Sequence, residues 1–132
     1  MQVIGNGVDI IEVRRIKNAI DRYGQGFLGR VFTDRELKNA KEHNGFYQHL
    51  AGRFAAKESV IKALGDIKLG FKNVEVLNNK EGRPYCSLLN YKQNKASPCA
   101  KERNKFNIHI SISHIKNYAV ASTIITQETS SS

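Results

Sequence analysis

The sequence predicts an α+β fold: a small single domain in which an antiparallel sheet packs on a long helix. Residues 107–114 alternate between apolar and polar side chains, and residues 118–125 answer them across a short turn, as in a β-hairpin. Over residues 13–23 and 47–64, apolar side chains instead recur at the spacing of helices that bury one side. Both periods occur in one short chain, so the class is α+β.

The N-terminal region is predicted to form a strand and then a helix. Residues 2–11 are rich in Val and Ile but contain Gly5 and Gly7. Glycine inside a strand indicates a bulge, or a close approach by another backbone or a ligand. The helical spacing begins at Val13, and the segment ends at Gly24 and Gly26.

The clearest local signal is a helix start at Thr33. Thr33 and Glu36 form a capping box, and Phe32 and Leu37 are placed to form a hydrophobic staple across it. This helix should end near residues 43–45. A longer helix is expected over residues 47–64, with Gly65 suited to the position just after its end.

The C-terminal half is predicted to be mostly strand. Residues 71–77 and 85–89 favour strands joined by a turn through 79–84, whereas residues 91–105 are polar and favour a loop with at most a short helix. The later hairpin turns at Lys116 and Asn117. We expect the domain to span residues 1–126, followed by a frayed polar tail at 127–132.

Length and composition indicate one soluble domain. The chain has 132 residues, of which 40% are hydrophobic and 25% charged. No run approaches the roughly 18 apolar residues of a membrane span, and the N-terminus lacks the pattern of a signal peptide. We therefore expect a cytoplasmic protein without membrane association. Cys86 and Cys99 match no zinc spacing and are expected to be inert thiols.

The formal net charge of +9 narrows the choice of partners. A basic surface attracts nucleic acid, phosphate-rich small molecules, anionic membranes or acidic proteins, and charge alone does not choose among them. A nucleic-acid-binding module is the leading non-enzymatic alternative. However, the basic residues are scattered and lack the aromatic platform of single-strand binders, so no nucleic-acid partner is expected.

The long helix carries charges where apolar residues are expected. On a helical wheel, Lys57 and Glu58 fall within the apolar arc, and Arg53 and Lys62 flank it. Burying an unpaired charge costs several kcal/mol. These groups must therefore be paired, bound to an ion, or facing a cleft or a subunit interface. The simpler alternative is an intrahelical Glu58–Lys62 pair beside a Lys57 that extends its ammonium to solvent.

A second carboxylate is out of place in the first strand, where Asp9 lies among Val8, Ile10 and Ile11. It could cap the sheet or form half of a salt bridge. Magnesium prefers a few carboxylates and fills its other positions with water and substrate phosphate. Asp9 and Glu58, with Arg53 and Lys62 nearby, would therefore suit a magnesium ion and a pyrophosphate-bearing substrate.

The four histidines differ in their expected roles. His43, His49 and His109 are predicted to face solvent, whereas His114 ends a strand, where side chains can reach a site. The sequence contains no H-E-x-x-H, G-x-S-x-G or P-loop motif, so zinc hydrolase, α/β-hydrolase and P-loop chemistry gain no support.

Several motifs resemble the 4′-phosphopantetheinyl transferases, specifically the short holo-acyl-carrier-protein synthases. They run in order along nearly the whole chain: GVDIIEVRRI at 7–16, FTDREL at 32–37, LAGRFAAKESVIKALG at 50–65, GRPY at 82–85 and ISISHIKNYAVA at 110–121. The combination of G-x-D with a distant F-x-x-K-E-x-x-x-K is fairly specific to this family. Ser59 departs from the family's usual alanine, and DIKLGF after Gly65 lacks a second nearby glycine, which leaves local coenzyme A contacts open.

The resemblance implies a function and a set of roles. The protein would transfer the 4′-phosphopantetheine arm of coenzyme A to a serine of an apo-acyl carrier protein and release adenosine 3′,5′-bisphosphate, in fatty acid or polyketide synthesis. It further implies homotrimers with active sites between subunits. An inactive subunit that retains the fold is a further alternative. The implied roles are: magnesium ligands, Asp9 and Glu58; catalytic residues, Glu58 and Lys62; coenzyme A contacts, Arg53, Lys62 and His114; carrier-protein contacts, Arg15 with Arg14, Lys17 and Arg22.

Overall fold

The computed structural model describes residues 1–66, 68–91 and 106–128. Strand β1 (Gln2–Glu12) is followed by four helices: α1 (Val13–Tyr23), α2 (Gln25–Val31), α3 (Asp34–Lys41) and α4 (Phe46–Leu64). A short 3-10 turn, η1 (Phe71–Asn73), then precedes β2 (Val74–Asn78), β3 (Pro84–Leu88), β4 (Phe106–His114) and β5 (Tyr118–Gln127). The predicted α+β class is confirmed.

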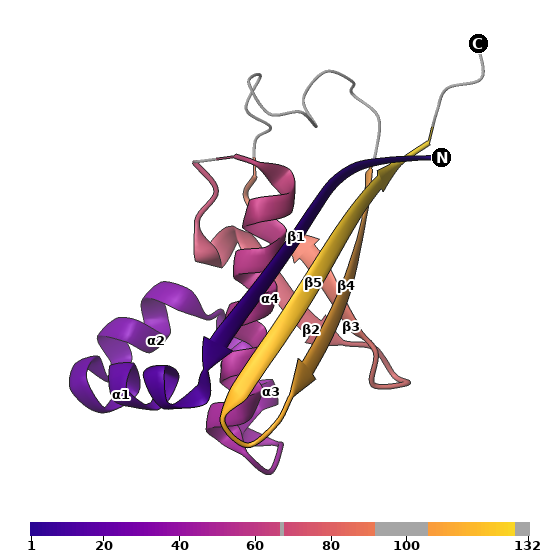
Figure 1. Ribbon diagram of the computed structural model, residues 1–132. Helices are drawn as coiled ribbons and strands as arrows, with labels where there is room; N and C mark the ends of the chain where they lie inside the picture. Colours follow the sequence, from indigo (N-terminus) through magenta and orange to yellow (C-terminus); the bar gives the residue numbers. More distant parts are fainter. Residues whose placement is uncertain (67, 92–105, 129–132) are drawn as a thin grey trace.

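The main sheet has three antiparallel strands in the order β1-β5-β4, and it lies across α4 (Figure 1). The β1–β5 register pairs the two ends of the chain, with Gln2 opposite Gln127 and Asp9 opposite Ala121. Strands β2 and β3 form a separate antiparallel pair. This pair contacts α4 through β2 and contacts the main sheet through β3 and β4.

Helix α4 lies at the centre of the core, which explains its lack of a clear polar face. Its C-terminal half packs with the sheets in a cluster that includes Val60, Leu64 and Ile125. Its N-terminal half packs with α1, α2 and α3 in a second cluster, around Phe32 and Leu50. No helix in the described residues is both long and apolar enough to cross a membrane.

Several local predictions are confirmed. Thr33 and Glu36 form the capping box at the start of α3. Gly65 follows α4 in the left-handed conformation, with φ of 66°. The hairpin of β4 and β5 turns at residues 115–117, as predicted.

The structure differs from the predictions in several places. Helix α2 was not expected, because Gly26 and Gly29 lower helix propensity. Residues 71–73 form a 3-10 turn instead of the start of a strand, with Asn73 Oδ1 accepting from the Gly70 amide. Strand β5 continues to Gln127, beyond the strand predicted over 118–125. The predicted loop at 91–105 lies outside the described residues except for Tyr91.

Candidate functional site

Two glycines set the position of β1 on α4. A Cβ atom at Gly7 would lie 2.1 Å from the Ser59 carbonyl oxygen, and one at Gly5 would lie 2.2 Å from that of Ala63. The β1 backbone therefore rests directly on the α4 backbone, and only glycine permits this contact. The predicted close approach of another backbone is confirmed. Asp9 follows two residues after Gly7 and so points toward the same helix.

Asp9 meets Lys62 across this contact. Lys62 Nζ donates to Asp9 Oδ1 at 2.9 Å and to the Val8 carbonyl at 3.1 Å. The Asp9 side chain is only 17% exposed, whereas that of Lys62 is 52% exposed. The ammonium of Lys62 therefore bonds with Asp9, on another element, rather than in the alternative intrahelical pair.

Glu58 lies close enough to Asp9 for their charges to interact. Burial and the negative charge of Asp9 raise the pKa of Glu58, and the Lys62 ammonium offsets part of this rise. Two carboxylates from distant parts of the sequence thus converge beside one cation.

The Asp9–Glu58 donor set fits magnesium. No group of three or more His, Cys, Asp or Glu side chains placed to hold a metal is found in the described part of the chain. Magnesium does not need such a group, because it is held by one or two carboxylates together with water and substrate phosphates. A divalent cation would also relieve the repulsion that raises the pKa of Glu58.

Arg53 lies apart from Asp9, Glu58 and Lys62, at a separate cavity. Its guanidinium donates to Asn78 Oδ1, and the residue is only 4% exposed. Burial lowers the pKa of Arg53, and the charge of Glu36 offsets part of the effect. Arg53 and His114 line a cavity of about 230 Å³ together with His43, His49, Gly52, Asn78, Gly82, Pro84 and Ile112.

The structure divides the predicted site residues into two groups. Asp9, Glu58 and Lys62 meet at the β1–α4 contact, whereas Arg53 and His114 meet at the cavity. Arg53 and Lys62 are nine residues apart in α4. At about 100° per residue they lie about 180° apart around the helix, so one chain does not bring the two groups together.

The prediction that His49 faces solvent is wrong. Its ring is partly buried, lines the cavity and stacks on His43 with centroids 4.4 Å apart. Burial lowers the pKa of His49 to about 4, with help from the positive charges of Arg53, His43 and His114. The missed signal was spacing, since His49 and Arg53 are four residues apart and share a helix face. His43 and His109 are exposed, as predicted.

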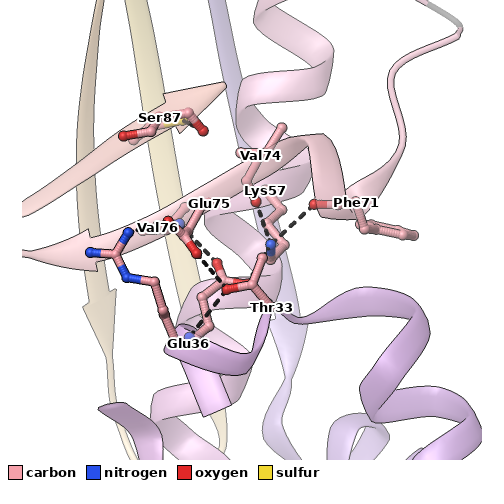
Figure 2. A network of polar contacts seen from close by, with 10 residues as sticks. Thr33, Glu36, Lys57, Phe71, Val74, Glu75, Val76 and Ser87 are labelled. Carbon is pink, nitrogen blue, oxygen red and sulfur yellow. Dashed lines mark hydrogen bonds and ion pairs between the residues drawn. The ribbon is translucent and has the colours of Figure 1, made fainter. Parts of the chain in front are cut away.

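Lys57 is fully buried, so the alternative of an ammonium that reaches solvent is wrong. Its ammonium forms an ion pair with Glu36 at 2.7 Å, and both side chains are 0% exposed (Figure 2). Burial lowers the pKa of Lys57, and Glu36 opposes this change. The expectation that a charge in the apolar arc must be paired is confirmed here.

The remaining residues named from the sequence are the arginines of α1 and the two cysteines. Arg14, Arg15 and Arg22 are exposed on α1, where they form part of a basic surface. Burial raises the pKa of the Cys86 thiol to about 12, which agrees with an inert thiol. Cys99 lies outside the described residues.

The chain is similar to known proteins along nearly its whole length. A family model described as the 4′-phosphopantetheinyl transferase superfamily matches residues 5–123. A holo-[acyl-carrier-protein] synthase of Clostridium tetani is 43% identical over 96% of this chain and 98% of its own. One of Thermodesulfovibrio yellowstonii is 44% identical over 92% and 97%, respectively.

Solved structures agree with the sequence relatives. A holo-(acyl-carrier-protein) synthase from Bacillus anthracis, in complex with CoA (3′,5′-ADP), has a TM-score of 0.76 at 31% identity and covers 98% of this chain and 100% of its own. An ACPS–CoA complex from Chronobacterium ammoniagenes has a TM-score of 0.77 at 28% identity, covering 98% and 100%. With this fold, the converging carboxylates and a family match over residues 5–123, the chain belongs to the 4′-phosphopantetheinyl transferase superfamily.

Proposed function

We propose that this protein transfers the 4′-phosphopantetheine arm of coenzyme A to a serine of an acyl carrier protein, with magnesium held by Asp9 and Glu58. The convergence of these two carboxylates beside Lys62 is the observation that carries the proposal. The names of the relatives and the coenzyme A complexes of the structural neighbours support the same substrates.

The two groups of site residues suit the phosphates of coenzyme A. The pyrophosphate would approach Asp9, Glu58 and Lys62, where magnesium neutralises negative charge and polarises a phosphoryl oxygen when bound. The cavity of Arg53 and His114 would receive another anionic part of the molecule, because its charged and polar walls include no carboxylate.

The chemistry follows from the side chains at the β1–α4 contact. The carrier serine oxygen forms a bond to the β-phosphorus, and the bridging P–O bond to adenosine 3′,5′-bisphosphate breaks. Glu58 takes the serine proton directly or through a water. Lys62 is half exposed and can turn from Asp9 toward the phosphates, where its ammonium stabilises charge on the leaving oxygen.

A homotrimer would complete the site. The two groups face opposite sides of α4, so each active site would combine Asp9, Glu58 and Lys62 of one subunit with Arg53 and His114 of another. The outer face of the main sheet supports subunit contact, because it exposes apolar side chains: Val8 is 62%, Ile10 65% and Ile124 47% exposed. Sedimentation at two concentrations tests the assembly, and a monomer at both would contradict it.

The carrier protein would bind at α1. Acyl carrier proteins of this kind are acidic partners, and Arg14, Arg15 and Arg22 present positive charge there. The net charge of +9 is consistent with that complementarity. A cytoplasmic location remains part of the proposal.

The decisive experiment is a transfer assay. Incubating apo-carrier protein with coenzyme A should add the mass of the arm only when magnesium is present. Asp9→Ala and Glu58→Ala should abolish the addition, whereas Glu12→Ala, an exposed acid at the end of the same strand, should not. Full activity in either of the first two variants would overturn the assignment.

A further inference from the structure

The ammonium of Lys57 has a complete set of acceptors inside the protein. It bonds with Glu36 Oε1 at 2.7 Å, with the Phe71 carbonyl at 3.0 Å and with the Val74 carbonyl (Figure 2). An ammonium has three N–H donors, so each donor has one partner. These acceptors come from α3, η1 and β2, and Lys57 itself lies at the centre of α4.

The Glu36 carboxylate is equally satisfied. Oε1 accepts from the Thr33 amide at 2.8 Å, and Oε2 accepts from the Val76 amide at 2.8 Å. Glu75 adds a second link between α3 and β2, since its Oε2 accepts from Thr33 Oγ1 at 2.7 Å. Buried ion pairs are often no more stabilising than apolar residues of the same size. What this pair supplies is directional bonding, which holds β2 at one place along α4.

Strand β2 is bonded to α4 at two points. Lys57 bonds with the Val74 carbonyl at the start of the strand, and Arg53, four residues earlier on the same face of α4, donates to Asn78 at its end. The turn after β2 then contributes Gly82 to the cavity that Arg53 lines, and Pro84, the first residue of β3, lines it too. The position of β2 on α4 therefore sets both the partner of Arg53 and one wall of its cavity.

We infer that Glu36 and Lys57 are positioning residues for the substrate pocket of Arg53: their buried pair fixes β2 on α4 and, through Asn78, holds the guanidinium and the facing wall in place. The identity of the ligand as coenzyme A rests on the proposed function. Neither Glu36 nor Lys57 is exposed, so their effect on binding is transmitted through β2 rather than by contact.

A double-mutant cycle tests the inference. Steady-state KM for coenzyme A and for carrier protein is measured for Lys57→Met, Asn78→Ala and the double variant, at a temperature where circular dichroism shows each to be folded. Each single substitution should raise the KM for coenzyme A about tenfold and leave that for carrier protein unchanged. The KM for coenzyme A of the double variant should not exceed that of the single variant with the higher KM, because both changes act through one connection.

A matched control separates positioning from lost stability. Ile16→Ala removes buried volume in α1 and should lower the melting temperature without changing the KM for coenzyme A. If Lys57→Met does not fold, Glu36→Asp, which shortens the side chain by one methylene and draws the carboxylate away from the Lys57 ammonium, should show the same rise in KM. An unchanged KM for coenzyme A in a folded Glu36 or Lys57 variant, or additive effects in the cycle, would overturn the inference. Absence of transfer by the unsubstituted protein would instead overturn the proposed function.

Discussion

Replacing Gly7 with alanine should damage both stability and activity, because the new methyl group meets backbone. The added Cβ would lie 2.1 Å from the Ser59 carbonyl oxygen, whereas Cβ contacts under 3.0 Å are essentially never found. Strand β1 must therefore retreat from α4 by about 1 Å. Overpacking of this kind costs about 1–3 kcal/mol of unfolding free energy. A displacement of about 1 Å at a reacting centre can lower the rate about 100-fold, and Asp9 moves with the strand.

Urea denaturation and the mass-shift transfer assay measure the two effects. Gly29→Ala is the matched control, since Gly29 is exposed in α2 and its added Cβ would have no atom within 4 Å. That variant should keep full activity and gain up to about 1 kcal/mol from better helix propensity. If Gly7→Ala were as stable and active as the unsubstituted protein, the close β1–α4 contact could not be what positions Asp9.

Three further predictions follow from other contacts. The pKa of His49 is about 4 in the folded protein against an ordinary 6.5, so as the pH falls this histidine is protonated in the unfolded chain before it is protonated in the folded one. The free energy of unfolding should therefore be unaffected by His49 above about pH 6.5 and should decrease from there toward pH 4. With allowance for the partial exposure of His49, the loss of unfolding free energy should be about 1–2 kcal/mol. His49→Phe should flatten this part of the stability–pH curve. A curve unchanged from that of the unsubstituted protein would contradict the reasoning. Thr33→Ala removes a helix cap and a buried partner of Glu75, and should cost about 2–3 kcal/mol in urea denaturation, whereas Thr33→Ser should cost much less. Asp9→Asn should lower the pKa of Glu58 in a carbon-13 NMR titration, because one of its two causes is removed, and an unchanged pKa would show that the two carboxylates do not interact.

Features that depend on neighbouring residues could be predicted from the sequence. The capping box joins Thr33 and Glu36 within a single turn, and Gly65 ends α4 by its own conformational freedom. Gly5 and Gly7 indicated a bulge, or a close approach by another backbone or a ligand, because an isolated glycine otherwise only weakens a strand. The helical wheel likewise identified Lys57 and Glu58 as charges in need of partners.

The partners themselves could not be predicted, because they come from distant segments. Lys57 pairs with Glu36 and Lys62 with Asp9, and no local pattern relates these positions. The role of His49 was missed because a helix boundary with several polar residues is usually exposed, and here β4 and the β2–β3 turn cover it. The separation of Arg53 from Lys62 follows from simple helix geometry once both are placed on α4.

The pairing of Gln2 with Gln127 bears on how the protein is made. In the described residues, β1 takes its ladder partners from β5 alone, a strand that is synthesised long after β1. Pairing across so long a separation is slow, since the chain must close a large loop before it gains the contacts. The Asp9 carboxylate on β1 should thus reach its final place late in folding, only when β5 has paired with the first strand.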